Sequence, residues 1–445
     1  MKRRLKWVGL ISLLPIGVFF LFLALMVYRE TVASSDLKRK LDELRQAGQP
    51  FDNDSLALYF EKLSHKEGTA AWSEILTLSR ASRAGTGAND LPIVGTGKYP
   101  HELQPGSAWP DEPRVAEYLE QVRPIIKRVQ LADSFPKPVW MPVRFDGLST
   151  LLEETQESRL AVRILELDCA YALYHNESER ALKDIDAMRS VADAFNWPFC
   201  MSTQWIAIAS LGIQRESIDR SLDMNVWNEE QLTKLSAQVD KPYDIAQAWR
   251  AGYAGELAMV NASLDNLSES LPRESMGNQL LQLPIMPSTR LEILRVYETW
   301  QRLSDDGGEG LAERANANLA TQFATQRYSL TNMYLSFFLL NSTQIIFNFD
   351  GLEMGRRLTH TSLAVKRFQV KNNRWPKNLS ELSDVGLVQK DWRATKKESF
   401  GYAVEGDRAF VWSYEPVKGS GVATKRPAFQ PDTGVGIMSL LVSIR

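Results

Sequence analysis

The chain has 445 residues, of which 44% are hydrophobic and 24% are charged, the composition of an ordinary globular protein. This composition excludes a disordered chain, a collagen and a small disulfide-rich domain, and the length allows two or three hydrophobic cores. The formal net charge of −2 argues against a nucleic-acid binder that relies on neutralising phosphates. Two cysteines and four scattered histidines give no zinc-ligand spacing, so the sequence predicts neither a metal nor a cofactor.

An uncharged segment near the start of the chain predicts a membrane anchor. Residues 8–27 are twenty residues without a charge, which at about 1.5 Å per residue cross a bilayer core of about 30 Å. Trp7 and Tyr28 bracket this segment, and four basic side chains precede it. Cytoplasmic flanks are enriched in positive charge. We therefore expect residues 1–7 to be a cytoplasmic tail, residues 8–28 a single transmembrane helix, and the remainder to lie outside the cytoplasm.

A cleaved signal peptide is the competing interpretation of this segment. Signal peptides have an apolar core of about 7–15 residues and a small-residue cleavage site, and the core here is longer. The candidate site at residues 31–33 follows the charged pair Arg29-Glu30. We therefore favour an uncleaved anchor, although the basic run at residues 38–40 weakens the predicted orientation. Polar residues interrupt a second apolar stretch, residues 332–349, which predicts a buried helix pair rather than another span.

Short elements follow the predicted anchor. Residues 29–84 have the pattern of short amphipathic helices, at residues 36–44, 55–63 and 69–83. Residues 85–113 contain five glycines and five prolines, which predicts a surface loop. A helix bent near Pro124 and a proline-rich extended crossing complete the segment that we place at residues 85–148.

Residues 149–354 predict a helical body. Apolar residues recur with the 3.6-residue period of a helix over residues 151–174 and 178–195. Further helices are expected over residues 198–222, 227–241, 243–268, 288–303 and 310–341. Because the turns between these helices are short, neighbouring helices should be antiparallel. The predicted fold is mainly α, an irregular antiparallel helix-hairpin bundle.

Residues 355–445 predict a C-terminal helix followed by a small β-hairpin. The helix covers residues 355–371, and two aromatic, β-prone runs at residues 400–405 and 409–414 flank the turn pair Gly406-Asp407. Residues 435–444 are a candidate third strand.

Charge divides at the same boundary. Residues 30–354 carry 31 basic and 46 acidic side chains, whereas residues 355–445 carry 16 basic and 8 acidic ones. Solvated surface together with attraction between the two parts is one interpretation. A basic C-terminal part that faces an anionic partner, such as lipid head groups, is the other.

The segment around Pro376 resembles a known arrangement. Residues 364–382, AVKRFQVKNNRWPKNLSEL, form a helix pattern, an Asn-x-aromatic-Pro stop and a Leu-x-x-Leu pair. This resembles the helix–Pro–LxxL part of pseudopilins. It also resembles the C-terminal module of single-pass, membrane-anchored, mostly helical bacterial proteins abundant in planctomycetes. Residues 136–253 are similar to their helical body. The resemblance implies location in a bacterial inner membrane and no known activity.

Pseudopilin function itself fails a check, because no glutamate follows Gly9 at the fifth position. The module therefore predicts local structure rather than a ligand site. Asn372-Asn373 suits a left-handed helix stop, and Pro376 forbids continuation of the helix. We expect Trp375, Leu379 and Leu382 to cover the helix end.

Motif fragments elsewhere predict no catalysis. Gly95-Thr96-Gly97-Lys98 lacks the spacing of a phosphate-binding loop, and Ser35-x-x-Lys38 lacks the Lys-Thr-Gly partner of penicillin-binding enzymes. His175 is expected to cap a helix, and His360 to be a surface or packing residue. The carboxylates Glu153, Glu154 and Glu157 should form a solvated face paired with Arg159 and Arg163.

Two hypotheses of function follow. The first is a non-enzymatic envelope protein, whose lipid partner is the bilayer around residues 8–28 and whose helical domain binds or scaffolds another envelope protein. The alternative is a membrane-tethered hydrolase with a site assembled from distant residues. We favour the first, and the sequence assigns no catalytic, cofactor-binding or metal-binding residue. A deep pocket with convergent titratable side chains would favour the enzyme, and a concavity lined only by aliphatic and aromatic side chains would favour binding.

The two cysteines are predicted to be free thiols. Cys169 lies before the turn at Asn176, and Cys200 lies beyond the far end of the next helix. In an antiparallel hairpin their heights differ by about 15 Å at about 1.5 Å per residue, whereas a disulfide needs Cα atoms within about 7 Å.

Overall fold

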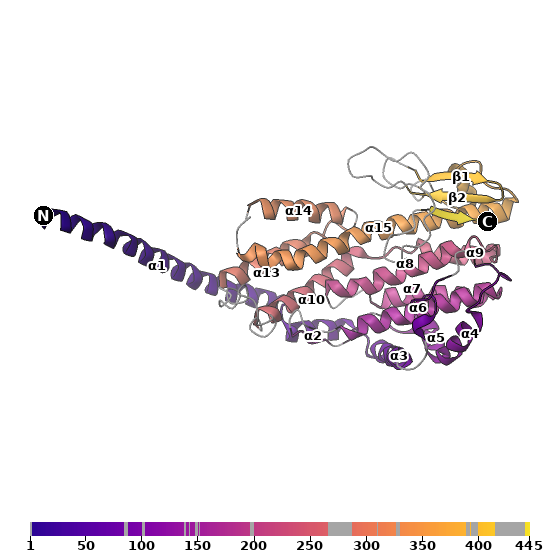
Figure 1. Cartoon of the computed structure of the whole chain (residues 1–445), viewed down its shortest axis with the longest axis horizontal. Coiled ribbons are helices and arrows are strands. Elements are labelled where there is room, and N and C mark those ends of the chain that lie inside the picture. Colours follow the sequence, from indigo (N-terminus) through magenta and orange to yellow (C-terminus); the bar gives the residue numbers. More distant parts are fainter. Residues whose placement is uncertain are drawn as a thin grey trace. The chain divides into compact units, whose positions relative to one another are not determined.

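The computed structural model is mainly helical, with one small antiparallel sheet (Figure 1). It describes residues 2–83, 88–99, 103–137, 139–141, 143–146, 150, 152–195, 200–265, 287–308, 310–325, 330–388, 392, 399–413 and 441–445. Within these ranges the side chains of residues 2–16, 19, 22, 23, 26, 83, 202, 312, 319, 322–350 and 441 are not described. The chain divides into two compact units, each built from three separate stretches. Unit 1 comprises residues 1–62, 142–150 and 249–341, and unit 2 the remainder.

Unit 1 is built on a long N-terminal helix, α1 (Lys2–Gln46). The other helices that contribute to it are α2 (Asn53–Leu63), the larger part of α10 (Ile245–Asp265), α13 (Pro287–Arg302), α14 (Leu311–Thr325) and the start of α15 (Leu330–Asn372). Its core is aromatic where α10 meets α13. The rings of Trp249 and Trp300 stack with centroids 6.0 Å apart, and Trp249 Nε1 donates to the Trp300 carbonyl over 2.7 Å. Both indoles are fully buried.

Helix α1 does not stop at the end of the predicted anchor. The sequence predicts a span ending at Tyr28 and a separate short helix over residues 36–44, but one continuous helix contains both (Figure 1). No glycine or proline stands between residues 18 and 47, so nothing in the chain breaks the backbone hydrogen bonds. The helix ends where Gly48 adopts the left-handed conformation, φ 66°, a usual helix terminator.

Within the part of the chain that the structure describes, no helix combines the length and the apolar character needed to cross a bilayer. Many of the side chains in the predicted anchor, residues 8–28, lie outside the described residues.

Unit 2 is mainly helical, and the two helices that the 3.6-residue period predicts over residues 151–174 and 178–195 belong to it. Its helices before α15 are α3 (Lys66–Arg83), α4 (Glu112–Gln121), α5 (Arg123–Gln130), α6 (Glu153–Tyr174), α7 (Ser178–Ala194), α8 (Gln204–Ser221) and α9 (Glu229–Asp240). Helices α6, α7 and α8 all pack against one another in a hairpin array. The α6–α7 turn is tight because Asn176 adopts a left-handed φ of 60°, and Asn228 begins α9 with a capping box. Pro124 does more than bend a helix, because α4 ends and α5 begins around it.

The C-terminal part of unit 2 confirms the predicted module. Helix α15 ends at Asn372, Asn373 takes φ 52°, and Leu379 and Leu382 of the following 3₁₀ helix η4 (Leu379–Val385) are buried. Strands β1 (Gly401–Glu405) and β2 (Arg408–Trp412) form the expected hairpin, with Gly406 at φ 64°. Strand β3 (Leu441–Ile444) pairs with β2, giving the antiparallel order β1-β2-β3. Trp375 is only half-buried.

Helix α15 also corrects a prediction. The sequence predicts separate helices, with a helix pair over residues 332–349, whereas the backbone is one helix of 43 residues. The part of α15 that belongs to unit 2 carries Lys366, which is 1% exposed and makes hydrogen bonds within that unit. Lys366 Nζ donates to Asn225 Oδ1 over 2.9 Å and to the Arg445 carbonyl. Burial lowers the pKa of Lys366, and the charge of Asp223 opposes this effect.

Candidate functional site

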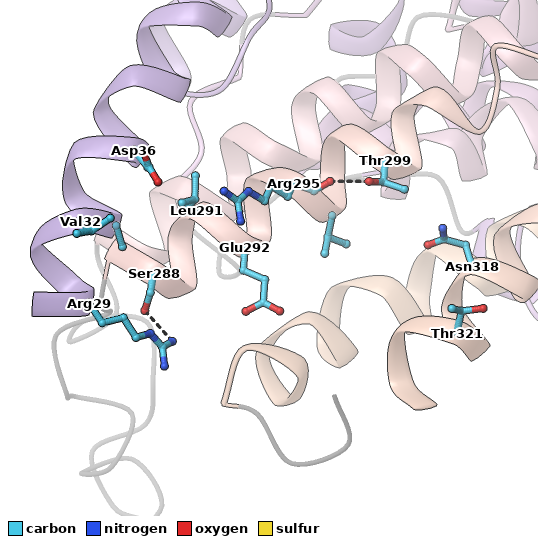
Figure 2. A pocket seen from close by; sticks show the side chains of 12 residues that line it. Arg29, Val32, Asp36, Ser288, Leu291, Glu292, Arg295, Thr299, Asn318 and Thr321 are labelled. Carbon is cyan, nitrogen blue, oxygen red and sulfur yellow. Dashed lines mark hydrogen bonds between the residues drawn. The ribbon is translucent and has the colours of Figure 1, made fainter. Parts of the chain in front are cut away.

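A pocket opens between three helices of unit 1, α1, α13 and α14 (Figure 2). Its volume is about 640 Å³. Four lining residues come from α1 at positions i, i+3, i+4 and i+7, which lie on one helix face: Arg29, Val32, Ala33 and Asp36. The others come from α13 and α14: Ser288, Leu291, Glu292, Arg295, Val296, Thr299, Asn318 and Thr321. The lining therefore mixes charged, polar and aliphatic side chains. It matches neither the deep pocket with convergent titratable groups expected for an enzyme nor the purely aliphatic and aromatic concavity expected for binding.

Glu30 on α1 binds Ser288, a lining residue at the start of α13. Its Oε2 accepts from the Ser288 backbone N–H over 3.1 Å, and its Oε1 accepts from the Ser288 hydroxyl over 2.7 Å. Ser288 lies in the first turn of α13, where unpaired N–H groups and the helix dipole favour a carboxylate. Arg29 donates to the same hydroxyl over 3.3 Å. These contacts fix the start of α13 against α1.

Four charged side chains of both signs line the pocket. Arg29 and Arg295 are cationic, and Asp36 and Glu292 are anionic. Asp36 pairs with Arg39 at 2.9 Å. Among the described residues, the side chains of Glu292 and Arg295 have neither a hydrogen bond nor an ion pair. Glu292 and Arg295 are three positions apart on α13 and so lie on the same side of the helix. In Figure 2 the Glu292 carboxylate and the Arg295 guanidinium nevertheless point to different sides of the cavity.

The floor of the pocket is apolar. Ala33 and Leu291 are each 7% exposed, whereas Val32 is 44% exposed at the edge. Histidine, cysteine and tyrosine are absent from the lining. Such a pocket can hold a molecule with an apolar part and charges of both signs.

The strongest candidate for acid–base chemistry lies in unit 2, as a pair of buried carboxyl groups. Asp168 on α6 and Asp184 on α7 are both 0% exposed. Arg180 Nε donates to Asp168 Oδ2 over 3.1 Å, and Gln130 Nε2 donates to Asp184 Oδ1 over 2.7 Å. Burial, the charge of Asp168 and a hydrogen bond between the two carboxyl groups raise the pKa of Asp184 well above its usual range, against the effect of Gln130. Burial and the neighbouring Asp168 therefore favour the protonated form of Asp184.

This carboxyl pair belongs to a buried network that stabilises the packing of α6. Two residues before Asp168, Glu166 is 1% exposed and pairs with Arg163 at 2.8 Å and Arg220 at 2.9 Å. Burial and the nearby carboxylates raise the pKa of Cys169 well above its usual range, so its thiol is unreactive. Because the carboxyl groups have no exposed surface, a substrate has no access to them.

A second buried polar contact joins α8 to α15. Asp219 Oδ1 accepts from the Thr359 hydroxyl over 2.8 Å, and Asp219 Oδ2 lies 3.8 Å from Arg215 Nε. Burial raises the pKa of Asp219 to about 7, and Arg215 and Thr359 oppose this shift. The Arg215 guanidinium lies directly against Gly355 of α15, so a Cβ added there would overlap it unless Arg215 moved.

The rejected motif fragments have structural explanations. Ser35 and Lys38 are both exposed on α1. At Gly95 and Gly97, an added Cβ would overlap backbone of residues 88–91, which include the 3₁₀ helix η1 (Ala88–Asp90). Thr96 donates its N–H to the Asn89 carbonyl over 2.7 Å. The two glycines permit this close packing and form no phosphate cradle.

His175 and His360 lie at the positions expected of capping and packing residues. His175 is the C-cap of α6, and its Nε2 is 3.2 Å from Glu112 Oε1. Its ring also contacts the rings of Tyr171 and Tyr174. His360 is 12% exposed, with Nδ1 3.8 Å from Asp240 Oδ1.

The carboxylates near the start of α6 require a correction. Glu153 is exposed and pairs with Arg80 at 3.0 Å, but Glu157 is buried, 4% exposed, so the three glutamates do not share a solvated face. The local charge pattern does not record that other helices pack on α6. In the described part of the chain, no three His, Cys, Asp or Glu residues gather as metal ligands.

Both cysteines are free, as the sequence predicts, and both are buried.

The sequence did not predict the pocket of unit 1. The only trace of the pocket in the sequence is the spacing of Arg29, Val32, Ala33 and Asp36, which suits one helix face. That spacing can be interpreted only when α1 is known to continue past Tyr28.

No protein-family model, curated protein or solved structure matches this chain. The resemblance of residues 364–382 to a bacterial membrane-anchored family therefore stays a prediction.

Proposed function

We propose that the chain is a single-pass protein of the bacterial inner membrane, with a cytoplasmic N-terminus and a helical extracytoplasmic domain that scaffolds an envelope partner. The observation that carries the proposal is the continuity of α1. The uncharged run of residues 8–27 and the residues that pack on α13 belong to the same helix, Lys2–Gln46.

A continuous helix has a mechanical consequence for such an anchor. A flexible linker would let a tethered domain move freely, whereas a helix transmits the position of the span directly to the residues that follow. The contacts of Glu30 with Ser288 begin two residues after Tyr28. Unit 1 would therefore be held close to the membrane surface in a defined orientation.

The helical body supports a binding role. Among the described residues, its most buried titratable cluster, Asp168 and Asp184, is inaccessible and serves packing. Helix-hairpin arrays present extended surfaces to protein partners. We propose that the partner is an envelope protein on the same side of the membrane as unit 2.

Topology and extraction test the proposal. A periplasm-dependent reporter fused after Arg445 should be active, and the full chain should stay with the membrane in alkaline carbonate. Replacing the four basic residues before the span by glutamine should reduce the reporter activity, because those charges orient the anchor. A reporter active only in the cytoplasm, or release of the chain by carbonate, would overturn the proposal. Crosslinking of the full-length protein in its own membrane, followed by purification, tests for the partner.

A further inference from the structure

We infer that the pocket of unit 1 binds the zwitterionic headgroup of a phospholipid, a phosphodiester joined to an amine, at the membrane surface. This inference rests on the proposed function, because it needs α1 to leave the bilayer near Tyr28. Three observations carry it: the depth of the pocket along α1, the two signs of charge in its lining, and its apolar floor.

The depth of the pocket follows from α1. Its lining residues on this helix run from Arg29 to Asp36, a rise of about 10 Å at about 1.5 Å per residue. The headgroup region on each side of a bilayer is about 5–7 Å thick, the difference between about 40–45 Å overall and an apolar core of about 30 Å. A span that ends at Tyr28 places Arg29 and Val32 in that region and Asp36 about 12 Å above the apolar core. The end of the pocket at Arg29 therefore lies at the level of the headgroups, and the end at Asp36 lies beyond them.

The charges of the pocket match a zwitterion. Arg295 and Arg29 can donate to phosphate oxygens, as guanidinium groups commonly do. Glu292 and Asp36 can accept from an ammonium group. Glu292 and Arg295 have no side-chain partner among the described residues and point to different sides of the cavity (Figure 2). They are thus available to hold the two ends of one headgroup.

The same charges argue against a headgroup that carries only negative charge. Glu292 and Asp36 would face such a headgroup without an ammonium group between them, and like charges in a partly enclosed site repel. The floor formed by Ala33 and Leu291 suits the carbon atoms that connect the headgroup to its acyl chains. A volume of about 640 Å³ is in the usual range for small-ligand pockets.

Lipid retention by the full-length protein tests the inference. The protein in detergent is mixed with dioleoyl phosphatidylethanolamine or dioleoyl phosphatidylglycerol, and bound lipid is counted by native mass spectrometry. We expect retention of phosphatidylethanolamine at about tenfold lower concentration than phosphatidylglycerol. Glu292→Gln and Arg295→Gln should each weaken retention of phosphatidylethanolamine about tenfold. Glu292→Gln should not weaken retention of phosphatidylglycerol.

Matched controls lie on the same helices outside the pocket. Arg302→Gln on α13 and Glu313→Gln on α14 remove the same charges from exposed positions and should leave retention unchanged. Circular dichroism of each variant shows whether it has folded. If the controls weaken retention as much as the pocket variants, the effect is one of overall charge and the inference is wrong.

Other outcomes separate this inference from the proposed function. Equal retention of both lipids, or of neither, overturns the headgroup site while carbonate extraction still tests the anchor. Calorimetry with free phosphoethanolamine and with inorganic phosphate distinguishes the source of the ligand: binding of the free headgroup as tight as that of the lipid would mean a soluble ligand. Release of the chain by carbonate would overturn the anchor itself.

Discussion

Lys40 on α1 and Glu298 on α13 form an ion pair in which Nζ lies 2.8 Å from Oε2. Their side chains are 21% and 27% exposed, so the pair is shielded from solvent more than a typical surface pair. Together with the contact of Glu30 with Ser288, it fastens α1 along α13. The pocket between these helices depends on that alignment.

Removing Lys40 should loosen α1. In Lys40→Met the apolar stem is kept and the charge is lost, so we expect unit 1 to lose about 1 kcal/mol of stability. Hydrogen exchange of residues 29–46 measures the effect locally. Arg45→Gln is the control, because Arg45 pairs with Asp42 at an exposed position on the same helix. Equal exchange in both variants would contradict a role for the pair.

Replacement of the two buried aspartates by asparagine should change the free energy of unfolding to different extents. Because burial and the neighbouring Asp168 raise the pKa of Asp184 and favour its neutral form, Asp184→Asn should change the free energy of unfolding by less than about 1 kcal/mol. Asp168→Asn removes the buried carboxylate that pairs with Arg180 and Arg123 and leaves Arg180 only the half-exposed Glu177, and we expect a loss of about 3 kcal/mol. Urea unfolding followed by circular dichroism measures both. A loss in Asp184→Asn as large as in Asp168→Asn would show that Asp184 is ionised.

Asp219 should make stability depend on pH. Its pKa is about 7 in the folded protein and 3.8 in the unfolded chain, so the folded state binds the extra proton between these values. Stability from this group is therefore present at low pH and is lost as the pH rises through about 7. Relative to Asp219→Asn, the wild-type protein should lose about 2–3 kcal/mol between pH 5 and pH 8. The measurement is urea unfolding at both pH values.

The constant effect of losing the Asp219 carboxylate beside Arg215 cancels in this comparison, because only the difference between the two pH values is used. A parallel pH profile for the two proteins would contradict the assignment.

Two helical glycines provide a matched pair of substitutions. At Gly355 an added methyl group would overlap the Arg215 guanidinium, whose Cζ lies 2.9 Å from the Cβ position. Gly212 on α8 has nothing within 4 Å of that position. Although alanine is about 1 kcal/mol better than glycine in a helix, Gly355→Ala should destabilise by about 1–3 kcal/mol.

Gly212→Ala should instead stabilise the protein by up to about 1 kcal/mol. Thermal unfolding of both variants measures the difference. Stabilisation by both substitutions would mean that Arg215 moves aside at little cost.

Local patterns were sufficient for the elements whose causes are local. The apolar period predicts α6 and α7, Gly406-Asp407 predicts the turn between β1 and β2, and Asn373 ends α15 in the left-handed conformation that asparagine tolerates. The free state of Cys169 and Cys200 also followed from helix lengths. In each case the deciding interactions lie within a few residues of one another or along one hairpin.

Tertiary structure decided what depends on distant neighbours. Glu157 is buried because other helices pack on α6, and the pKa of Asp184 is raised by burial and by the adjacent Asp168. The pocket exists because α13 and α14, more than 250 residues away in sequence, pack beside residues 29–36 of α1. The sequence by itself determined many of the helical segments and local turns such as those at Asn176 and Gly406, but not that α1 and α15 each continue without a break. Which helix faces are buried, and which carboxyl groups have raised pKa values, was set by packing between segments whose contacts no local pattern records.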